Sequence, residues 1–387
     1  MIKYDRLTGK ATSVPLGATT TGQPVGQPLQ LASGLVLGGT NIRTAAGLTP
    51  TRSYQGVYTL NPATGATRDY PLPFADLVAQ GKPQYTTAMR APHSFTQAAN
   101  GTVWSLVPYY LHLLFSPSVV LAPGLFALDA ASGAPTGEIH FFDYSPGSAG
   151  PAAGALGYLS PMAAQGNVLV FVTPTTFADA VDGSRVWCVD LATRDANNHP
   201  ASGSALLTPG GAADEAWWPL FGPTLAKKTG QLYLMTTAIG PTTSPTRQVR
   251  ILKMQVGSPV TVAPAVTAVL TVAGAVDLPG TPLFDASDGN LYYGTATGRL
   301  MKFDPVAKAV TMVADLAATP GVTTDCRGFL SEAGGGVLMG IAADQDSTGS
   351  LTTRRAFRYI LATGASTTTA VEASDRDPFP GITPILH

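Results

Sequence analysis

The sequence predicts an all-β fold, a β-propeller of seven blades formed by residues 1–387 as a single domain. The observations behind this prediction are a hairpin pattern that recurs seven times, a second hairpin pattern that alternates with it, and the composition. Gly contributes 42 residues and Pro 32, whereas charged residues make up only 12% of the chain. This composition is typical of many short strands joined by turns, and it differs from that of disordered chains, which combine low hydrophobicity with high net charge.

The first recurring pattern is an apolar strand, an Asp or Asn, a small-residue turn that ends in Gly, and a second strand. Its copies begin at residues 2, 57, 125, 186, 250, 300 and 356. Asp or Asn caps such a turn with its own side chain and Gly takes the positive-φ position, so each copy is predicted to be a β-hairpin. The turn residues are clearest in Asp5–Gly9, Asn61–Gly65 and Asp129–Gly133, and the copies at 186, 250 and 300 are degenerate.

The second pattern is an apolar strand, a polar turn with Gly, and another strand rich in Val, Leu and Tyr. Its copies begin at residues 27, 92, 160, 222, 281 and 327, and a lone first strand ends the chain at residues 382–387. The two hairpins together form a four-stranded antiparallel unit, and a propeller is the radial repetition of such a unit. A solenoid is the structural alternative, but it requires capping repeats, which the sequence does not show.

The two ends of the chain predict how the ring closes. The chain begins with an outer hairpin at residues 2–16 and ends with the lone strand at residues 382–387, so we expect these segments to pair in one composite blade. Closure of this kind removes the exposed edge of a sheet. Six or eight blades are the alternatives to seven.

The charge and cysteine content argue against several classes of function. The formal net charge is -1 and the 23 Lys and Arg residues are scattered, so a nucleic acid or an anionic membrane is not an expected partner. The two cysteines, Cys188 and Cys326, have no CxxC spacing and are expected to be isolated thiols in strands, without a metal. No cofactor is predicted.

The composition also bears on the location of the protein. The most apolar stretch, Leu106–Leu121, is interrupted by Pro108, His112, Pro117 and Ser118, so no transmembrane segment is predicted. Low charge and abundant Thr resemble the composition of exported bacterial proteins. We therefore expect a secreted, periplasmic or cell-surface protein whose export signal is not part of this numbering.

The segment LFDASDGNLYYGTATGRLMKFDP at residues 283–305 resembles the tandem repeats of exported bacterial β-propellers. The likeness is to the extracellular-repeat (GloVer-type) group and to the quinoprotein-like or YncE-like group. It covers Asp288–Thr295 and the hairpin copies, about a third of the chain, and it implies a blade rather than an activity. Quinoprotein dehydrogenases carry a tryptophan motif in each blade, and with only four Trp this chain lacks it, so their cofactor is not implied.

Polar and aromatic side chains are concentrated where the chain enters the predicted innermost strands. Loops at these positions surround the central channel of a propeller, and ligands often bind there. Aromatic faces beside hydrogen-bonding groups would suit a glycan, a peptide or a protein. The alternative is that the Trp pair packs under a loop and that the charged groups are solvated or paired locally. The predicted ligand-binding residues are Gln27, Arg90, His93, Tyr158, Trp217, Trp218, Asp325, Arg327 and Asp377.

The candidates for catalysis are His93, Arg327 and Glu215. His93 directly precedes an inner strand and would act as a general base, because imidazole titrates near neutrality. Glu215 with Asp325 or Asp377 would supply the two carboxylates of a glycoside hydrolase. The predicted function is an exported binding or scaffold propeller that recognises a glycan, peptide or protein at the channel face, and the alternative is a polysaccharide lyase or hydrolase.

The apolar insertion at residues 107–123 has two interpretations. Hairpin loops are usually short and polar, so an apolar loop requires a burial partner. The insertion either folds back on its own blade or docks another subunit, a lipid or a second protein. In the second case the protein would have a structural or assembly role. The docking residues would be Tyr109, Tyr110, Leu113, Leu114 and Phe115.

Overall fold

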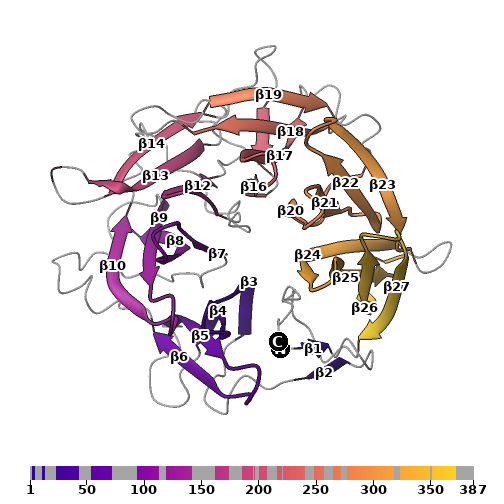
Figure 1. Ribbon diagram of the computed structural model, residues 1–387, viewed down its shortest axis with the longest axis horizontal. Helices are drawn as coiled ribbons and strands as arrows, with labels where there is room; N and C mark the ends of the chain where they lie inside the picture. Colours follow the sequence, from indigo (N-terminus) through magenta and orange to yellow (C-terminus); the bar gives the residue numbers. More distant parts are fainter. Residues whose placement is uncertain are drawn as a thin grey trace. The chain divides into compact units, whose positions relative to one another are not determined.

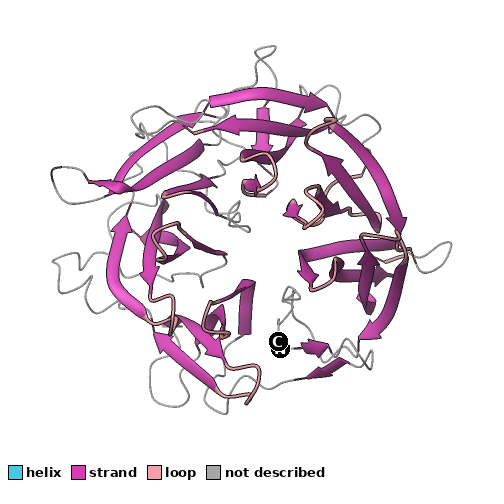
Figure 2. Cartoon of the chain, in the orientation of Figure 1, coloured by secondary structure: helices cyan, strands magenta, loops and turns pink. Residues whose placement is uncertain are grey.

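The structure is a computed structural model, and it describes strands and their connecting turns over most of the chain (Figures 1 and 2). The described residues contain no helix, and hence none able to cross a membrane. The chain divides into two compact units, which are described separately. The described residues are 2–4, 11–13, 23–42, 54–71, 94–112, 119–141, 162–173, 185–194, 196, 200–206, 216–219, 221–239, 248–256, 265–271, 277–317, 323–348 and 351–371.

One unit, Pro15–Gly210 with Val256–Pro264, contains three four-stranded antiparallel sheets. In each sheet the strands follow one another in sequence order. The first consists of β3 (Gln23–Gln30), β4 (Val36–Ile42), β5 (Tyr54–Leu60) and β6 (Thr67–Pro71). The second consists of β7 (Ser94–Gln97), β8 (Val103–His112), β9 (Val119–Leu128) and β10 (Pro135–Phe141). The third consists of β11 (Ala163–Gln165), β12 (Val168–Thr173), β13 (Arg185–Arg194) and β14 (Pro200–Leu206).

The other unit, Met1–Val14 with Gly211–Gln255 and Ala265–His387, contains three larger sheets and a two-stranded one. The five-stranded sheet has β15 (Ala216–Pro219), β16 (Thr224–Ala226), β17 (Gln231–Ile239), β18 (Gln248–Gln255) and β19 (Ala265–Thr271). The next has β20 (Phe284–Asp285), β21 (Leu291–Gly294), β22 (Arg299–Asp304) and β23 (Ala309–Asp315). The last has β24 (Thr323–Ala333), β25 (Val337–Gln345), β26 (Leu351–Ile360) and β27 (Ser366–Val371). The two-stranded sheet pairs β1 (Ile2–Tyr4) with β2 (Ala11–Ser13).

The described strands confirm the all-β class and the blade topology of a β-propeller, because six sheets are antiparallel meanders of four strands, one with a fifth strand added. Within the described residues the number of complete sheets is six, which was given as an alternative, and not the predicted seven. In this part of the chain the hairpin copy at residue 2 forms only the short pair β1 and β2, so a repeat count based on turn chemistry overestimates the number of full sheets. Pairing of this hairpin with residues 382–387 lies outside the described residues and stays a prediction, as does the single domain.

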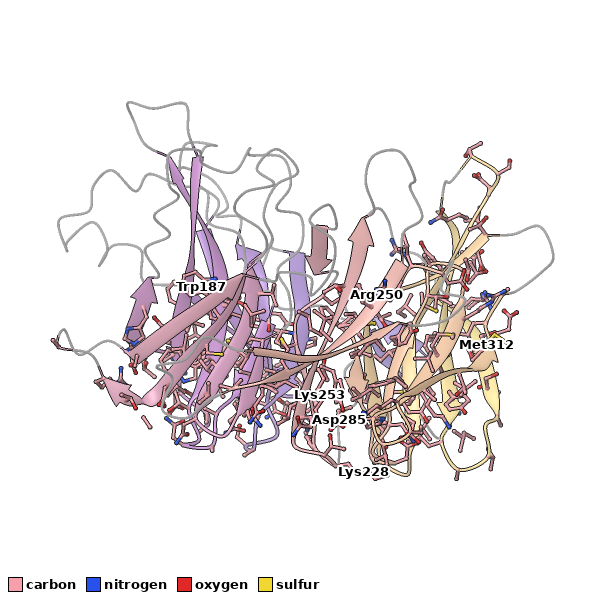
Figure 3. All side chains as sticks on the ribbon, turned by 90° about the horizontal axis from the view of Figure 1, so that it is seen from above. Trp187, Lys228, Arg250, Lys253, Asp285 and Met312 are labelled. Carbon is pink, nitrogen blue, oxygen red and sulfur yellow. The ribbon has the colours of Figure 1, made fainter. Side chains whose placement is uncertain are left out.

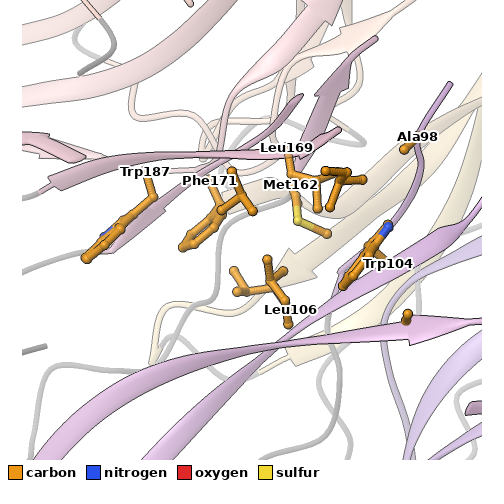
Figure 4. Packing of buried hydrophobic residues seen from close by; sticks show 11 residues of the cluster. Ala98, Trp104, Leu106, Met162, Leu169, Phe171 and Trp187 are labelled. Carbon is orange, nitrogen blue, oxygen red and sulfur yellow. The ribbon is translucent and has the colours of Figure 1, made fainter. Parts of the chain in front are cut away.

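Consecutive sheets within each unit pack face to face, and a hydrophobic cluster joins each such pair of sheets. In Figure 4, Leu106 of the second sheet lies beside Phe171 of the third, and both are fully buried. The neighbouring cluster unites Leu37 of the first sheet with Leu128 of the second. Sheets stacked in this way bury both faces of their central strands, which explains the near-continuous apolar sequences of β12 and β25.

The predicted insertion at residues 107–123 is for the most part a continuation of two strands. Register pairs run from Val103↔Leu128 to His112↔Val119, so β8 and β9 form one long hairpin where a loop was expected. The expectation of a loop was wrong for these paired residues, because an apolar run interrupted by Pro still satisfies its backbone groups by pairing across the hairpin. The pairing agrees with the interpretation that the segment folds back on its own blade. Leu113, Leu114 and Phe115 lie outside the described residues.

The last sheet of the second unit depends on a close approach at Gly340. A Cβ atom at this position would lie 2.5 Å from Cζ of Phe357 and 2.8 Å from Cδ2 of Leu330. Phe357 is fully buried and packs with Leu338 and Tyr292. Gly340 is therefore required so that the Phe357 ring can lie across β25.

We expect Phe357→Ala to lower the free energy of unfolding by about 3–5 kcal/mol, because it removes buried apolar surface and leaves a cavity. Urea denaturation followed by circular dichroism measures this change. Thr367→Ala on the exposed strand β27 is the matched control, with an expected change within about 0.5 kcal/mol. Equal effects of the two substitutions would contradict the packing described above.

Candidate functional site

Each sheet has two distinct ends. At the turn end, the first and second strands are joined by short turns, such as residues 227–230 between β16 and β17 and residues 286–290 between β20 and β21. At the connection end, the second strand passes to the third and the chain arrives from the preceding sheet. Here the spans are mostly longer, for example residues 72–93 between β6 and β7. Figure 3 labels Lys228 and Asp285 at the turn end and Arg250, farther toward the connection end, in the same unit.

Two predicted site segments lie at the connection end of their sheets. Trp217 and Trp218 belong to β15, where they pair with Ala238 and Thr237 near the end of β17. Asp325 and Arg327 belong to β24, where Asp325 pairs with Ala343 near the end of β25 and Arg327 pairs with Ile341 at its middle. Both segments are in the same unit, and the backbone places them at equivalent ends of their sheets. Their convergence on one site stays a prediction.

The segment between β14 and β16, which contains no copy of either hairpin pattern, includes strand β15. Sequence patterns missed this strand because its partner residues in β17 lie about twenty positions away and no turn joins the two segments directly. Gln27 is part of strand β3. Arg90, His93, Tyr158, Glu215 and Asp377 lie outside the described residues, so their convergence on one site stays a prediction.

Asp325 is buried, with 9% of its surface exposed, and its Oδ2 accepts a hydrogen bond of 3.0 Å from Nε2 of Gln345. The sequence suggested two interpretations of Arg327 and Asp325. Either they place a cation and a carboxylate at the channel mouth, or they form a local salt bridge. One partner of the carboxylate is the Gln345 amide on the neighbouring strand β25. This contact holds Asp325 against the sheet at the connection end.

A buried ion pair supports this end of the same sheet. Arg355 of β26 donates to both carboxylate oxygens of Asp344, from Nε at 2.8 Å and from an Nη at 2.7 Å. The same nitrogen donates to the carbonyl of Leu316, which follows the preceding sheet, at 2.7 Å. Thr324 of β24 donates to Asp344 at 2.7 Å. The pair thus joins the strands β24, β25 and β26 to the preceding sheet. Thr324, which bonds to the pair, is the sequence neighbour of Asp325.

The charge state of Asp344 follows from these contacts. Burial alone would raise the pKa of its carboxyl, but hydrogen bonds from Arg355 and Thr324 and the charge of Arg355 outweigh it, so the pKa lies below its usual value. The side chains of Asp344 and Arg355 are only 7% and 10% exposed. Removing one member of a bidentate pair buried to this degree strongly destabilises the fold, because the remaining charge loses its partner.

The turn end of the same unit holds a pocket of about 800 Å³ that the sequence analysis did not predict. The turns of three consecutive sheets line it, with Lys227 and Lys228 from the first, Asp285 and Asp288 at the second, and Glu332 beside the third. These charged residues lie in or beside the turns of three successive copies of the second hairpin pattern, but at different positions within the copies. The sequence signal for them is therefore only the concentration of charge at these turns.

The pocket carboxylates already have partners within the protein. The backbone N–H of Lys227 donates to Asp285 at 3.3 Å, and the backbone N–H of Ser287 donates to Glu332 at 2.7 Å. Asp288 accepts from the hydroxyl of Tyr292 at 2.8 Å. Burial raises the pKa of Asp285, and Lys227 only partly opposes this. The bonds of Asp285 and Glu332 tie a turn to the next sheet, and the bond of Asp288 lies within its own hairpin, so all three carboxylates have a structural role.

The other unit has a comparable contact between sheets. Glu138 of β10 is bonded to Nε2 of His140 at 2.8 Å and accepts from Arg194 of β13 at 3.0 Å. The His140 ring stacks on Trp104 at 5.8 Å between centroids. Burial alone would raise the pKa of Glu138, but the bonds from His140 and Arg194 lower it below its usual value. The sequence analysis assigned these residues no role.

Both cysteines are free and buried, as predicted. Burial raises the pKa of the Cys188 thiol to about 12, and it raises that of Cys326 to about 12 as well. Neither thiol is therefore a nucleophile near neutral pH. In the described part of the chain, no group of three or more His, Cys, Asp or Glu side chains has the arrangement of a metal site.

Comparison with known proteins identifies a fold and no family. No protein-family model matches the chain, and no curated protein is significantly similar to it in sequence. The resemblance of Asp288–Thr295 to bacterial propeller repeats therefore supports only the fold.

Several solved structures resemble the chain. The polysaccharide lyase ulvan lyase of family PL25, bound to -[GlcA(1-4)Rha3S]-, has a TM-score of 0.51 at 9% identity, covering 95% of this chain and 87% of that one. The α-L-arabinofuranosidase Arb93A from Fusarium graminearum has 0.49 at 13% identity, covering 88% and 94%. The Cps50 (Swd1) β-propeller domain from Myceliophteria thermophila has 0.43 at 10% identity, covering 91% and 100%. At such identities, the likeness to ulvan lyase is one of fold alone.

We expect Asp344→Asn to lower the free energy of unfolding at neutral pH by about 3–5 kcal/mol, because it leaves Arg355 buried without its counter-charge. Denaturant unfolding across a pH series measures this change. The folded-state pKa of Asp344 is depressed, so its stabilisation is present above the unfolded-state pKa of about 3.9 and is lost as pH falls below it. The difference between variant and wild type should therefore shrink in acid.

Asp315→Asn, at an exposed residue that caps a turn, is the control for this experiment. Its effect should be small at every pH. If the two variants lost the same stability at neutral pH, the buried pair would not have the role described.

Proposed function

We propose that the protein is an exported binding or scaffold propeller that recognises a glycan, a peptide or a protein through the connection ends of its sheets. The observation that carries the proposal is the difference between the two ends. Short turns join the first two strands at one end, and mostly longer, unequal connections leave from the other. Long loops held by a rigid scaffold commonly form binding sites, because they can vary without disturbing the core.

The strand β15 adds a second argument for the same end. It is an extra strand, present in one of the six larger sheets, and it carries the adjacent residues Trp217 and Trp218. Tryptophan supplies a large contact area and a hydrogen-bond donor, which suits recognition of a sugar ring or a peptide. Pairing with β17 would hold these residues at a defined position in the proposed site.

The buried carboxylate Asp325 lies at the same end, one position from the Thr324 hydroxyl that bonds the Asp344–Arg355 pair. A site supported by such contacts needs little rearrangement to bind, which lowers the entropic cost of association. Gln27, Arg90, His93, Tyr158, Arg327 and Asp377 complete the proposed set.

The second proposal is a polysaccharide lyase or hydrolase with His93, Arg327 and Glu215 as the catalytic groups. It draws support from the fold shared with ulvan lyase, which was solved bound to -[GlcA(1-4)Rha3S]-. His93 would serve as a base and Arg327 would stabilise a carboxylate of the substrate. Export remains part of both proposals. A third proposal is a structural or assembly role, in which a partner docks through Tyr109, Tyr110, Leu113, Leu114 and Phe115.

The binding proposal predicts that the double substitution Trp217→Ala, Trp218→Ala weakens binding of the best ligand on a glycan array or peptide array by roughly 30-fold. This factor corresponds to about 2 kcal/mol, the loss typical of an aromatic anchor. Lys227→Ala with Lys228→Ala at the turn end is the matched control and should leave the affinity unchanged. The reverse result would place the site in the turn-end pocket.

The enzyme proposal predicts that the protein releases new chain ends from at least one polysaccharide in a panel that includes uronic-acid polymers. His93→Ala should reduce the rate by about 100-fold or more, as for loss of a general base. Absence of cleavage across the panel, or full activity in the variant, would contradict the enzyme proposal and leave only the binding proposal.

A further inference from the structure

In the part of the chain that the structure describes, strand β27 is a sheet edge without the usual protection against pairing. Its sequence, STTTAV, contains no charged residue, no Pro and no Gly, and residues 366–370 are exposed. Among the described strands, β27 pairs only with β26. The register from Arg354↔Val371 to Tyr359↔Ser366 is continuous, without a bulge. One side of this strand therefore offers its backbone groups to any strand that approaches it.

The other outer strands are interrupted or charged. β6 contains Arg68, Asp69 and Pro71. The pairings of β10, β14, β19 and β23 with their neighbours each include a register shift. Charges, prolines and bulges of this kind are the means by which natural sheets prevent their edges from pairing with other chains. The edge of β27 lacks all of them.

We propose that β27 pairs antiparallel with β27 of a second copy of this chain, forming one continuous sheet across a dimer. Thr and Val favour extended structure, and a short, neutral segment without Pro or Gly is typical of segments that pair with copies of themselves. No charge on β27 would repel the same strand in a second copy. A charged peptide would find no counter-charge there, which favours the second copy as the partner.

The geometry of this pairing limits the assembly to two copies. Antiparallel pairing of identical edges is isologous and consumes both edges, so the contact closes instead of propagating into a fibre. The strand itself is held in place by its own sheet, where Arg355 donates to Oγ1 of Thr368 at 3.4 Å. A single pair of short strands buries little surface, so the dimer should be weak and concentration-dependent.

Sedimentation equilibrium of the intact protein over a concentration series tests this proposal. The wild type should shift from monomer toward dimer as its concentration rises. Thr369→Lys, opposite Ala356 in its own sheet, should raise the dissociation constant at least tenfold, because two lysines meet across the dimer. Mixing the Thr369→Lys and Thr369→Glu variants in equal amounts should restore the dimer through opposite charges.

Thr311→Lys on β23 is the matched control, since Thr311 is also exposed on an outer strand, and it should leave the dimer unchanged. Thermal melting by circular dichroism establishes that each variant is folded. A wild type that stays monomeric at all concentrations would overturn the proposal. Equal weakening by Thr311→Lys and Thr369→Lys, or a charge-swapped mixture that dimerises no better than either variant alone, would also overturn it.

Discussion

The structure depends on the burial of both faces of the central strands of its sheets. An antiparallel sheet usually packs on one face and leaves the other to water. Here the strand β25 is buried on both sides from Val337 to Asp344. Side chains such as Tyr292 and Phe357 fill the space between consecutive sheets. Because the burial comes from neighbours, no single sheet could be stable alone, and stacking is what makes a chain of short hairpins fold.

Much of the fold could be predicted from the sequence because the signals for hairpins are local. Asn61 and Asp129 cap their turns through hydrogen bonds to backbone groups two and three residues on, as turn chemistry requires. Features that depend on distant partners were missed or misjudged. The strand β15 needs β17, and the number of complete sheets depends on whether the first hairpin gains further strands.

The candidate site was predictable only in part. The sequence analysis selected Trp217, Trp218 and Asp325, and the structure places their segments at equivalent ends of two sheets in one unit. It gave no indication of the Asp344–Arg355 pair, because Arg355 follows another Arg in a strand that resembles a surface strand. Burial of that guanidinium arises from the preceding sheet, through the carbonyl of Leu316. Tertiary contacts of this kind leave no periodic signal in the sequence.

The most direct test of this account is a double-mutant cycle across two stacked sheets. Leu106→Ala and Phe171→Ala remove facing side chains of the second and third sheets. If these sheets pack against each other, their effects on the free energy of unfolding should differ from additivity by about 0.5–3 kcal/mol. Phe171→Ala combined with Val306→Ala, at an exposed turn residue of the other unit, should be additive. Additivity of Leu106→Ala with Phe171→Ala would contradict face-to-face stacking of the sheets.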